Sequence, residues 1–156
     1  MVITDKLDGW NYIETQVDID ELQKITGGFH DAFIQTCEYD CGCCIESKTR
    51  EEKKISCKIH HDYGNKLQMV FDNIWFEKPF EMVFEHVSIL LLQPSDNLPT
   101  IYGAQIVLKE DVSFIIFNHS VHFNELLEKS EIKLKDLNEY DNIFVKAKTL
   151  RWRWLT

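Results

Sequence analysis

The 156-residue sequence lacks a long hydrophobic run and an N-terminal signal sequence. Its longest apolar stretch, Val87–Leu92, is interrupted by Ser88 and is far shorter than the roughly 20 residues that span a bilayer. Residues 1–8 contain no basic segment followed by an apolar one, which is the pattern of a secretory signal. We therefore expect a cytoplasmic protein that does not enter a membrane.

The sequence contains fewer basic than acidic residues. The chain carries 17 Lys and Arg against 26 Asp and Glu, for a formal net charge of -9. A field of this sign repels nucleic acid and anionic lipid and attracts basic proteins. We therefore expect a protein partner, in particular a basic one, and no nucleic acid.

The common catalytic motifs are also missing. The sequence has no P-loop, no Rossmann glycine pattern, no nucleophile elbow and no His-Glu-x-x-His zinc motif. His30, His86, His119 and His122 are spread over predicted strand ends and the start of a predicted helix, where histidines are more often hydrogen-bonded structural residues than bases. The sequence predicts neither an enzyme nor a cofactor.

The sequence does contain many apolar and aromatic residues. Hydrophobic residues are 44% of the composition and aromatic residues 12%, with ten Phe and four Trp spread over most of the length. A chain of this size can bury a core without disulfides or metals. We expect a single domain over residues 1–156 with a packed core that is mainly β.

A short helix followed directly by a strand forms the clearest local pattern. Ile19, Leu22 and Ile25 recur at helical spacing, with Asp18 as the predicted N-cap and Gly27 just past the helix end. From Phe29 the period changes to alternation, which places Asp31 on the apolar face of the new strand. We expect this carboxylate to be buried and to tie the junction together, because a buried carboxylate needs hydrogen-bond donors.

Alternation of apolar and polar residues in several segments predicts an α+β fold that is mainly β. We expect a single antiparallel sheet, or a partly closed barrel or sandwich, of about seven strands. The segments are Phe29–Tyr39, Ile55–His61, Leu67–Asp72, Phe80–Leu91, Ile101–Leu108, Val112–Phe117 and Ile143–Trp154. The alternation of apolar and polar residues shifts at Glu85-His86, which predicts a bulge or a strand end there. Leu150, Trp152 and Trp154 share one face of the last predicted strand. We also expect a second short helix over residues 120–129.

A charged stretch over about residues 38–54 has no apolar face. It indicates the tip of a long hairpin inserted into the domain. A protruding tip can enter a cleft of a partner without disturbing the sheet. The acidic candidates for contact with a basic partner are Asp40, Glu46, Glu51 and Glu52.

Five cysteines cluster near this stretch: Cys37, Cys41, Cys43, Cys44 and Cys57, followed by His60. The intervals of three, one and no residues differ from the two-residue spacing usual in zinc sites, so we expect thiols and no metal. A zinc-binding module built on these six residues is the alternative function. A Cys- or His-dependent enzyme is the third, although no pattern identifies its nucleophile.

Three segments carry a family resemblance. They are Gly28-Phe29-His30-Asp31-Ala32, then Phe84-Glu85-His86-Val87, and Val145–Trp152 in the last strand. Together they resemble small, mainly β bacterial proteins of uncharacterised families, some of which are assigned as immunity proteins of polymorphic toxin systems. The resemblance implies a structural role for Gly28, Phe29, His30, Asp31 and Trp152. It also implies a chain without enzymatic chemistry that binds another protein, which can be a toxin domain.

Overall fold

The structure, a computed structural model, describes residues 9–49, 54–59, 64–92, 100–101, 103–109, 112–117 and 143–156. For residues 44–49, 54–59, 100 and 112–117 it describes the backbone alone. The predicted second helix over residues 120–129 and residues 50–53 of the predicted hairpin tip lie outside the described residues.

The predicted helix is present as α1, Gln16–Thr26, and it begins earlier than expected. The N-cap is Thr15, whose hydroxyl oxygen accepts from the backbone N–H of Asp18, while the Asp18 carboxylate accepts from the backbone N–H of Thr15. Asp18 is therefore the third helical residue of a capping box and not the cap itself. Gly27 ends the helix in the left-handed conformation, with φ 59°, as predicted.

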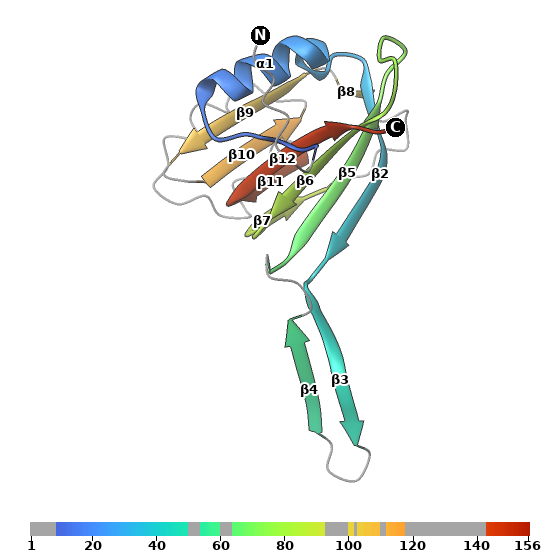
Figure 1. The fold of residues 1–156 in the computed structure, drawn as a ribbon, viewed down its shortest axis with the longest axis vertical. Helices are drawn as coiled ribbons and strands as arrows, with labels where there is room; N and C mark the ends of the chain where they lie inside the picture. The colour runs from blue at the N-terminus through green and yellow to red at the C-terminus, as the bar shows by residue number, and fades with distance from the viewer. Residues whose placement is uncertain are drawn as a thin grey trace.

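The mainly β fold is confirmed, with every described pairing antiparallel. The described strands are β1 Asn11–Tyr12, β2 Ala32–Asp40, β3 Cys43–Thr49, β4 Lys54–Ile59, β5 Lys66–Asp72, β6 Phe80–Glu85, β7 Ile89–Leu91, β8 Thr100–Ile101, β9 Ala104–Lys109, β10 Val112–Phe117, β11 Ile143–Ala147 and β12 Thr149–Trp154. They form a six-stranded sheet in the order β1-β12-β6-β5-β2-β8, a four-stranded sheet in the order β7-β11-β10-β9, and a separate hairpin β3-β4 (Figure 1).

Two long segments bend together to join the larger sheets. Residues 80–91 contribute β6 and β7, residues 143–154 contribute β11 and β12, and the two segments pair along both sheets. At the bend His86 has φ 53°, and the Lys148 N–H donates to the Glu85 carbonyl at 3.1 Å. The predicted strand end at Glu85-His86 is confirmed. The predicted single last strand is wrong, because the chain changes sheets at Lys148.

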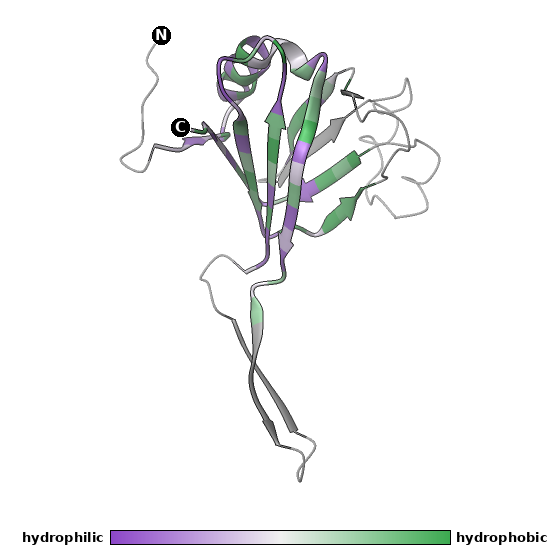
Figure 2. Cartoon of the chain, turned by 90° about the vertical axis from the view of Figure 1, so that its right-hand side faces the viewer, coloured by the Kyte–Doolittle hydropathy of each residue, from purple (hydrophilic) through white to green (hydrophobic). Residues whose placement is uncertain are grey.

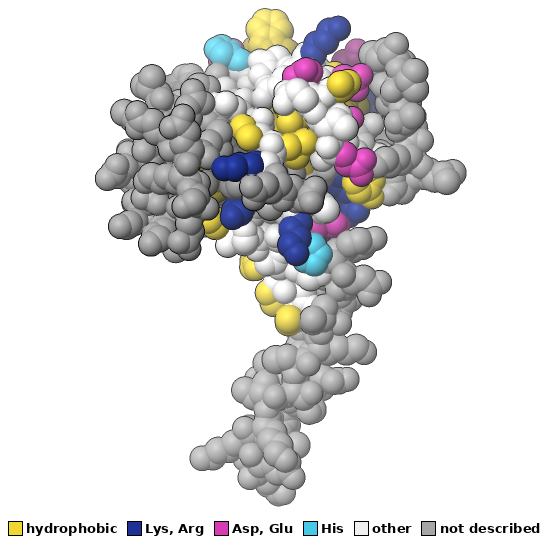
Figure 3. All heavy atoms as spheres, turned by 90° about the vertical axis from the view of Figure 1, so that its left-hand side faces the viewer, with side chains coloured by type: hydrophobic (Ala, Val, Ile, Leu, Met, Phe, Trp, Pro, Cys, Tyr) yellow, Lys and Arg dark blue, Asp and Glu magenta, His cyan; other side chains and the backbone are white. Residues whose placement is uncertain are grey.

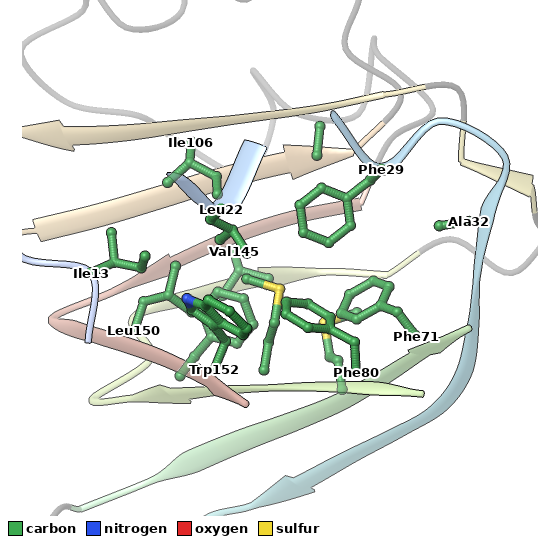
Figure 4. Close-up of a cluster of buried hydrophobic side chains, with 14 of the residues drawn as sticks. Ile13, Leu22, Phe29, Ala32, Phe71, Phe80, Ile106, Val145, Leu150 and Trp152 are labelled. Carbon is green, nitrogen blue, oxygen red and sulfur yellow. The ribbon is translucent and has the colours of Figure 1, made fainter. Parts of the chain in front are cut away.

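One hydrophobic core lies between α1 and the two larger sheets (Figure 4). The six-stranded sheet contributes Phe71, Phe80 and Trp152, and the four-stranded sheet contributes Ile106 and Val145. Helix α1 packs beside β9, where the Gln23 side-chain amide donates to the Ala104 carbonyl at 2.8 Å. The helix thereby covers one end of the core and holds β9 in place.

The hydropathy pattern matches this arrangement. Strand β10, whose sequence is almost entirely apolar, lies between β9 and β11, and β1 is an edge strand. We call α1 and the two larger sheets the body. Figure 2 shows hydrophobic and hydrophilic residues alternating along strands of the body. Within the described residues, no helix is long and apolar enough to cross a membrane.

Candidate protein-binding surface

The predicted helix–strand junction is a tight turn and not the start of a strand. Gly27, Gly28 and Phe29 have φ between 59° and 69°, and β2 begins only at Ala32. Phe29 is nevertheless fully buried, with its ring edge-on to Phe71 at 5.4 Å between centroids. The pairing of β2 with β5 also shifts register between Ile34 and Thr36, so one alternation running on from Phe29 does not hold, and Phe33 and Tyr39 are exposed.

Asp31 was expected to be buried, and the structure corrects this. Its side chain is 47% exposed and its Oδ2 lies 2.9 Å from Nδ1 of His30, which is also exposed. The Asp31 backbone, at φ 61°, donates its N–H to the carbonyl of Ile101. The residue therefore belongs to the end of the turn, where Asp tolerates the left-handed conformation, and its carboxylate anchors nothing in the core.

A buried asparagine ties this junction to the connection between β5 and β6. Asn73 is 5% exposed, and its side-chain amide donates to the His30 carbonyl at 2.8 Å. Its side-chain oxygen accepts from the Trp75 N–H at 2.9 Å, and its carbonyl accepts from the Phe76 N–H at 3.1 Å. The connection is thus held by hydrogen bonds on both sides of the asparagine.

We call residues 73–79 the aromatic turn. At its tip Ile74 is 82% exposed and Trp75 is 74% exposed. These are the two most exposed large hydrophobic side chains of the described residues. Trp75 projects from a braced backbone into solvent, which exposes a large apolar surface at one end of the body.

A groove of about 380 Å³ runs beside this tip. It is lined by Ile25 at the end of α1, by Trp154 at the end of β12, and by Trp75, Phe76, Glu77 and Lys78 of the aromatic turn. Phe76 packs edge-on against Trp154, with 5.7 Å between ring centroids, and the Leu155 N–H donates to the Pro79 carbonyl. The groove is therefore an aromatic-walled depression next to an exposed tryptophan.

Two arginines of β12 are paired with buried carboxylates of β6. On β12, Arg151 lies 2.9 Å from the Glu85 carboxylate and Arg153 lies 2.8 Å from the Glu81 carboxylate. Both guanidinium groups also stack on Trp10, at 4.7 and 4.1 Å from the ring centroid. The arginines beside Trp152 and Trp154 therefore face acidic neighbours, and Trp152 lies in the core, where it is 6% exposed.

The acidic residues proposed for partner contact fall in and around the hairpin β3-β4. Asp40 is half-buried and its Oδ1 accepts from the Gly42 N–H at 2.8 Å. Glu46 lies at an irregularity in the pairing of β3 with β4, between Ile45 and Ser47, and its side chain is not described. Glu51 and Glu52 lie outside the described residues. Their role in binding stays a prediction.

Three of the cysteines have described side chains. Cys41 and Cys43 are exposed thiols, and burial raises the pKa of the half-buried Cys37 thiol. A raised pKa lowers the thiolate fraction, which is the reverse of what a catalytic cysteine needs. Among described side chains no three metal-ligating groups gather, and those of Cys44, Cys57 and His60 lie outside this set. The zinc alternative stays a prediction.

The aromatic turn was not predicted from the sequence. The signal was available, because Ile74-Trp75-Phe76 places three consecutive apolar residues between two alternating strands, where a polar connection is expected. Figure 3 shows one face of the body, where hydrophobic, acidic and basic described side chains are interspersed. The exposed Ile74-Trp75 pair is therefore the more distinctive surface feature.

No known protein family, curated protein or solved structure matches this chain.

Proposed function

We propose that this chain is a non-enzymatic protein-binding domain that engages its partner through the aromatic turn and the groove beside it. The observation that carries this proposal is the 74% exposure of Trp75 on a turn braced by a buried asparagine. An exposed Trp is costly in water, and Trp is enriched among the residues that dominate protein interfaces. A braced turn also loses little conformational entropy on binding.

The surroundings of Trp75 support protein rather than small-molecule recognition. The groove opens at the surface next to Ile74 and Trp75, so a partner can cover the exposed tip and fill the groove at once. Its rim carries one acid and one base, Glu77 and Lys78, as interface rims usually do. The net charge of -9 favours a basic partner through faster encounter.

The most specific form of the proposal is an immunity protein that binds a toxin domain. It rests on the resemblance of the Gly28–Ala32 and Val145–Trp152 segments to families with such members. The partner is then encoded next to this chain, in a larger protein with a C-terminal catalytic domain. Titration calorimetry with that purified domain tests the proposal directly, and the absence of binding to it would reject the immunity role.

The contact surface is tested with two variants that each remove one exposed apolar side chain. Trp75→Ser should raise the dissociation constant of the partner complex about 30-fold, which corresponds to roughly 2 kcal/mol for an interface hot spot. Val17→Ser is the matched control, because Val17 is 65% exposed but lies at the start of α1, away from the groove lining.

Both variants should keep the circular dichroism spectrum of the wild type, because both positions face solvent. If Trp75→Ser binds as tightly as Val17→Ser, the aromatic turn is not the contact surface.

A further inference from the structure

The connection between β2 and β3 places two thiols on either side of a glycine. Strand β2 ends at Asp40 and β3 begins at Cys43, so the connection consists of Cys41 and Gly42 alone. Cys41 and Cys43 are both exposed. Figure 1 and Figure 2 show that the hairpin β3-β4 leaves the body at this point. An oxidant dissolved in water can therefore reach both thiols.

The backbone at Gly42 brings the Cys41 thiol next to Cys43. Gly42 has φ 76°, in the left-handed region, and its N–H donates to Oδ1 of Asp40 at 2.8 Å. The Cys41 thiol donates to the Cys43 carbonyl oxygen, with 3.5 Å between Sγ and the oxygen. Residues two apart lie at most roughly 7 Å from each other in an extended chain, and a bend at the glycine shortens that distance. A disulfide needs Cα atoms roughly 4.4–6.8 Å apart, so this pair can form one through local rotations.

The other cysteines are less suitable partners for this pair. Cys37 is half-buried, and burial raises the pKa of its thiol, which lowers its reactivity. The register of β3 with β4 makes Cys57 a diagonal neighbour of Cys43 and not its direct partner. Diagonal neighbours lie about 7–8 Å apart, which is longer than a disulfide allows. Cys44 follows Cys43 directly and is the remaining competitor for Cys41.

We propose that Cys41 and Cys43 form a reversible disulfide, which makes the start of the hairpin β3-β4 a site of redox modification. The oxidant is a small disulfide such as oxidised glutathione. The thiolate of one cysteine attacks a sulfur of the oxidant, which gives a mixed disulfide and releases one reduced glutathione. The thiolate of the other cysteine then attacks the protein sulfur of the mixed disulfide and releases the second. The two protein thiols lose two electrons and two protons overall, and these convert the oxidant into two thiols.

The disulfide acts on the backbone between the body and the hairpin. It closes a small ring around Gly42, whose φ and ψ angles set the direction in which β3 leaves β2. Closing the ring restricts these angles and fixes that direction. A ring this small is strained, and strained, exposed disulfides are readily reduced again. The inference does not depend on the proposed function, because it uses neither the aromatic turn nor its groove.

Equilibration of the whole chain in glutathione buffers tests the inference. With reduced glutathione in large excess, all five cysteines should be thiols. With oxidised glutathione in large excess, alkylation of the remaining thiols and tandem mass spectrometry of the tryptic peptide over residues 25–48 should locate a disulfide between Cys41 and Cys43. Returning the sample to reduced glutathione should restore both thiols. A peptide that stays fully reduced, or that carries only mixed disulfides with glutathione, would overturn the inference.

Three serine variants identify the two partners. Cys44→Ser keeps both of them, so it should form the disulfide at the same ratio of oxidised to reduced glutathione as the wild type, within about twofold. Cys41→Ser and Cys43→Ser should each lose the disulfide, and the cysteine that remains should carry glutathione instead. If Cys43→Ser still forms a disulfide within this peptide, or if Cys44→Ser prevents it, the assignment of the pair is wrong.

Discussion

At the residue scale, the turn between α1 and β2 combines buried packing with an unusual backbone. Phe29 lies at φ 63° while its ring is fully buried against Phe71 and Phe80. A non-glycine residue in the left-handed region costs about 1 kcal/mol or more, which the burial of an aromatic ring offsets. The glycines before it let the chain reverse direction so that this ring enters the core.

Gly28 provides a test of that backbone. At φ 69°, Gly28→Ala should lower the free energy of unfolding by about 1–2 kcal/mol, since alanine disfavours the left-handed region. The space is available, because an added Cβ would lie 3.5 Å from the Gln23 Oε1 atom, an ordinary contact. Urea denaturation measures the change.

Gly103→Ala is the matched control for this substitution. Gly103 does not have a positive φ, and an added Cβ would lie 3.8 Å from the Gly28 carbonyl oxygen. It should therefore change the unfolding free energy less than Gly28→Ala does. Equal losses for the two variants would show that the left-handed conformation at Gly28 is not what alanine disturbs.

At the scale of elements, β6 is buried on both faces. Phe80, Met82 and Phe84 face the core, while Glu81 and Glu85 are each 3% exposed on the other side. The strand next to it, β12, supplies an arginine for each carboxylate. The two strands are therefore joined by core packing on one face and by charge pairs on the other.

The ion pair between Glu85 and Arg151 should stabilise the contact between β6 and β12. Glu85→Ala should cost on the order of 3 kcal/mol in unfolding free energy, because it leaves the largely buried guanidinium of Arg151 without its carboxylate. Glu81→Ala should cost less, about 1 kcal/mol, because the arginine that it leaves unpaired, Arg153, has a side chain that is 41% exposed and can be solvated by water.

Chemical denaturation of both variants measures these effects. Glu85→Gln is the conservative control, since it keeps the size of the side chain and an oxygen that can accept from the Thr149 hydroxyl. It should lose less stability than Glu85→Ala. If Glu81→Ala proves more destabilising than Glu85→Ala, the burial of the arginine does not set the strength of these pairs.

At the scale of the whole molecule, α1 and the two larger sheets share one hydrophobic core. The paired segments 80–91 and 143–154 each run through both sheets, so neither sheet is complete without the other. Elements joined in this way should unfold together. This is the structural basis for expecting a single domain.

Guanidinium unfolding followed by two signals tests that expectation. Near-ultraviolet circular dichroism reports the packing of aromatic side chains such as Trp152, and far-ultraviolet circular dichroism reports the backbone. The two transitions should have the same midpoint. Midpoints that differ clearly would show that the sheets unfold as separate units and would contradict the single domain.

Much of the fold could be read from local patterns. Helical spacing of Ile19 and Leu22, the glycine at the end of α1, and alternation in β5 and β6 each predict what is found, because they depend on neighbours close in sequence. The N-cap was placed three residues late, since Asp18 is equally suited to the third helical position of a capping box. Element boundaries depend on such competing local choices.

The candidate surface could not be read in the same way. Asp31 looked buried because strand alternation was extended back through the turn, and only the backbone conformation of Gly27 to Phe29 shows where β2 begins. Nothing in the Ile74-Trp75 segment itself tells whether another element covers these two side chains. Exposure is set by contacts between residues far apart in the sequence.

The sequence by itself determined the mainly β class, the position of α1, the strand end at Glu85-His86 and the acidic character of the chain. Only the tertiary structure decided that residues 143–154 divide between two sheets, that Asn73 braces the junction near His30, and that Trp75 remains exposed. The physical reason is that periodicity assigns residues to faces locally, whereas strand pairing and the covering of each face require partners brought together by the whole fold.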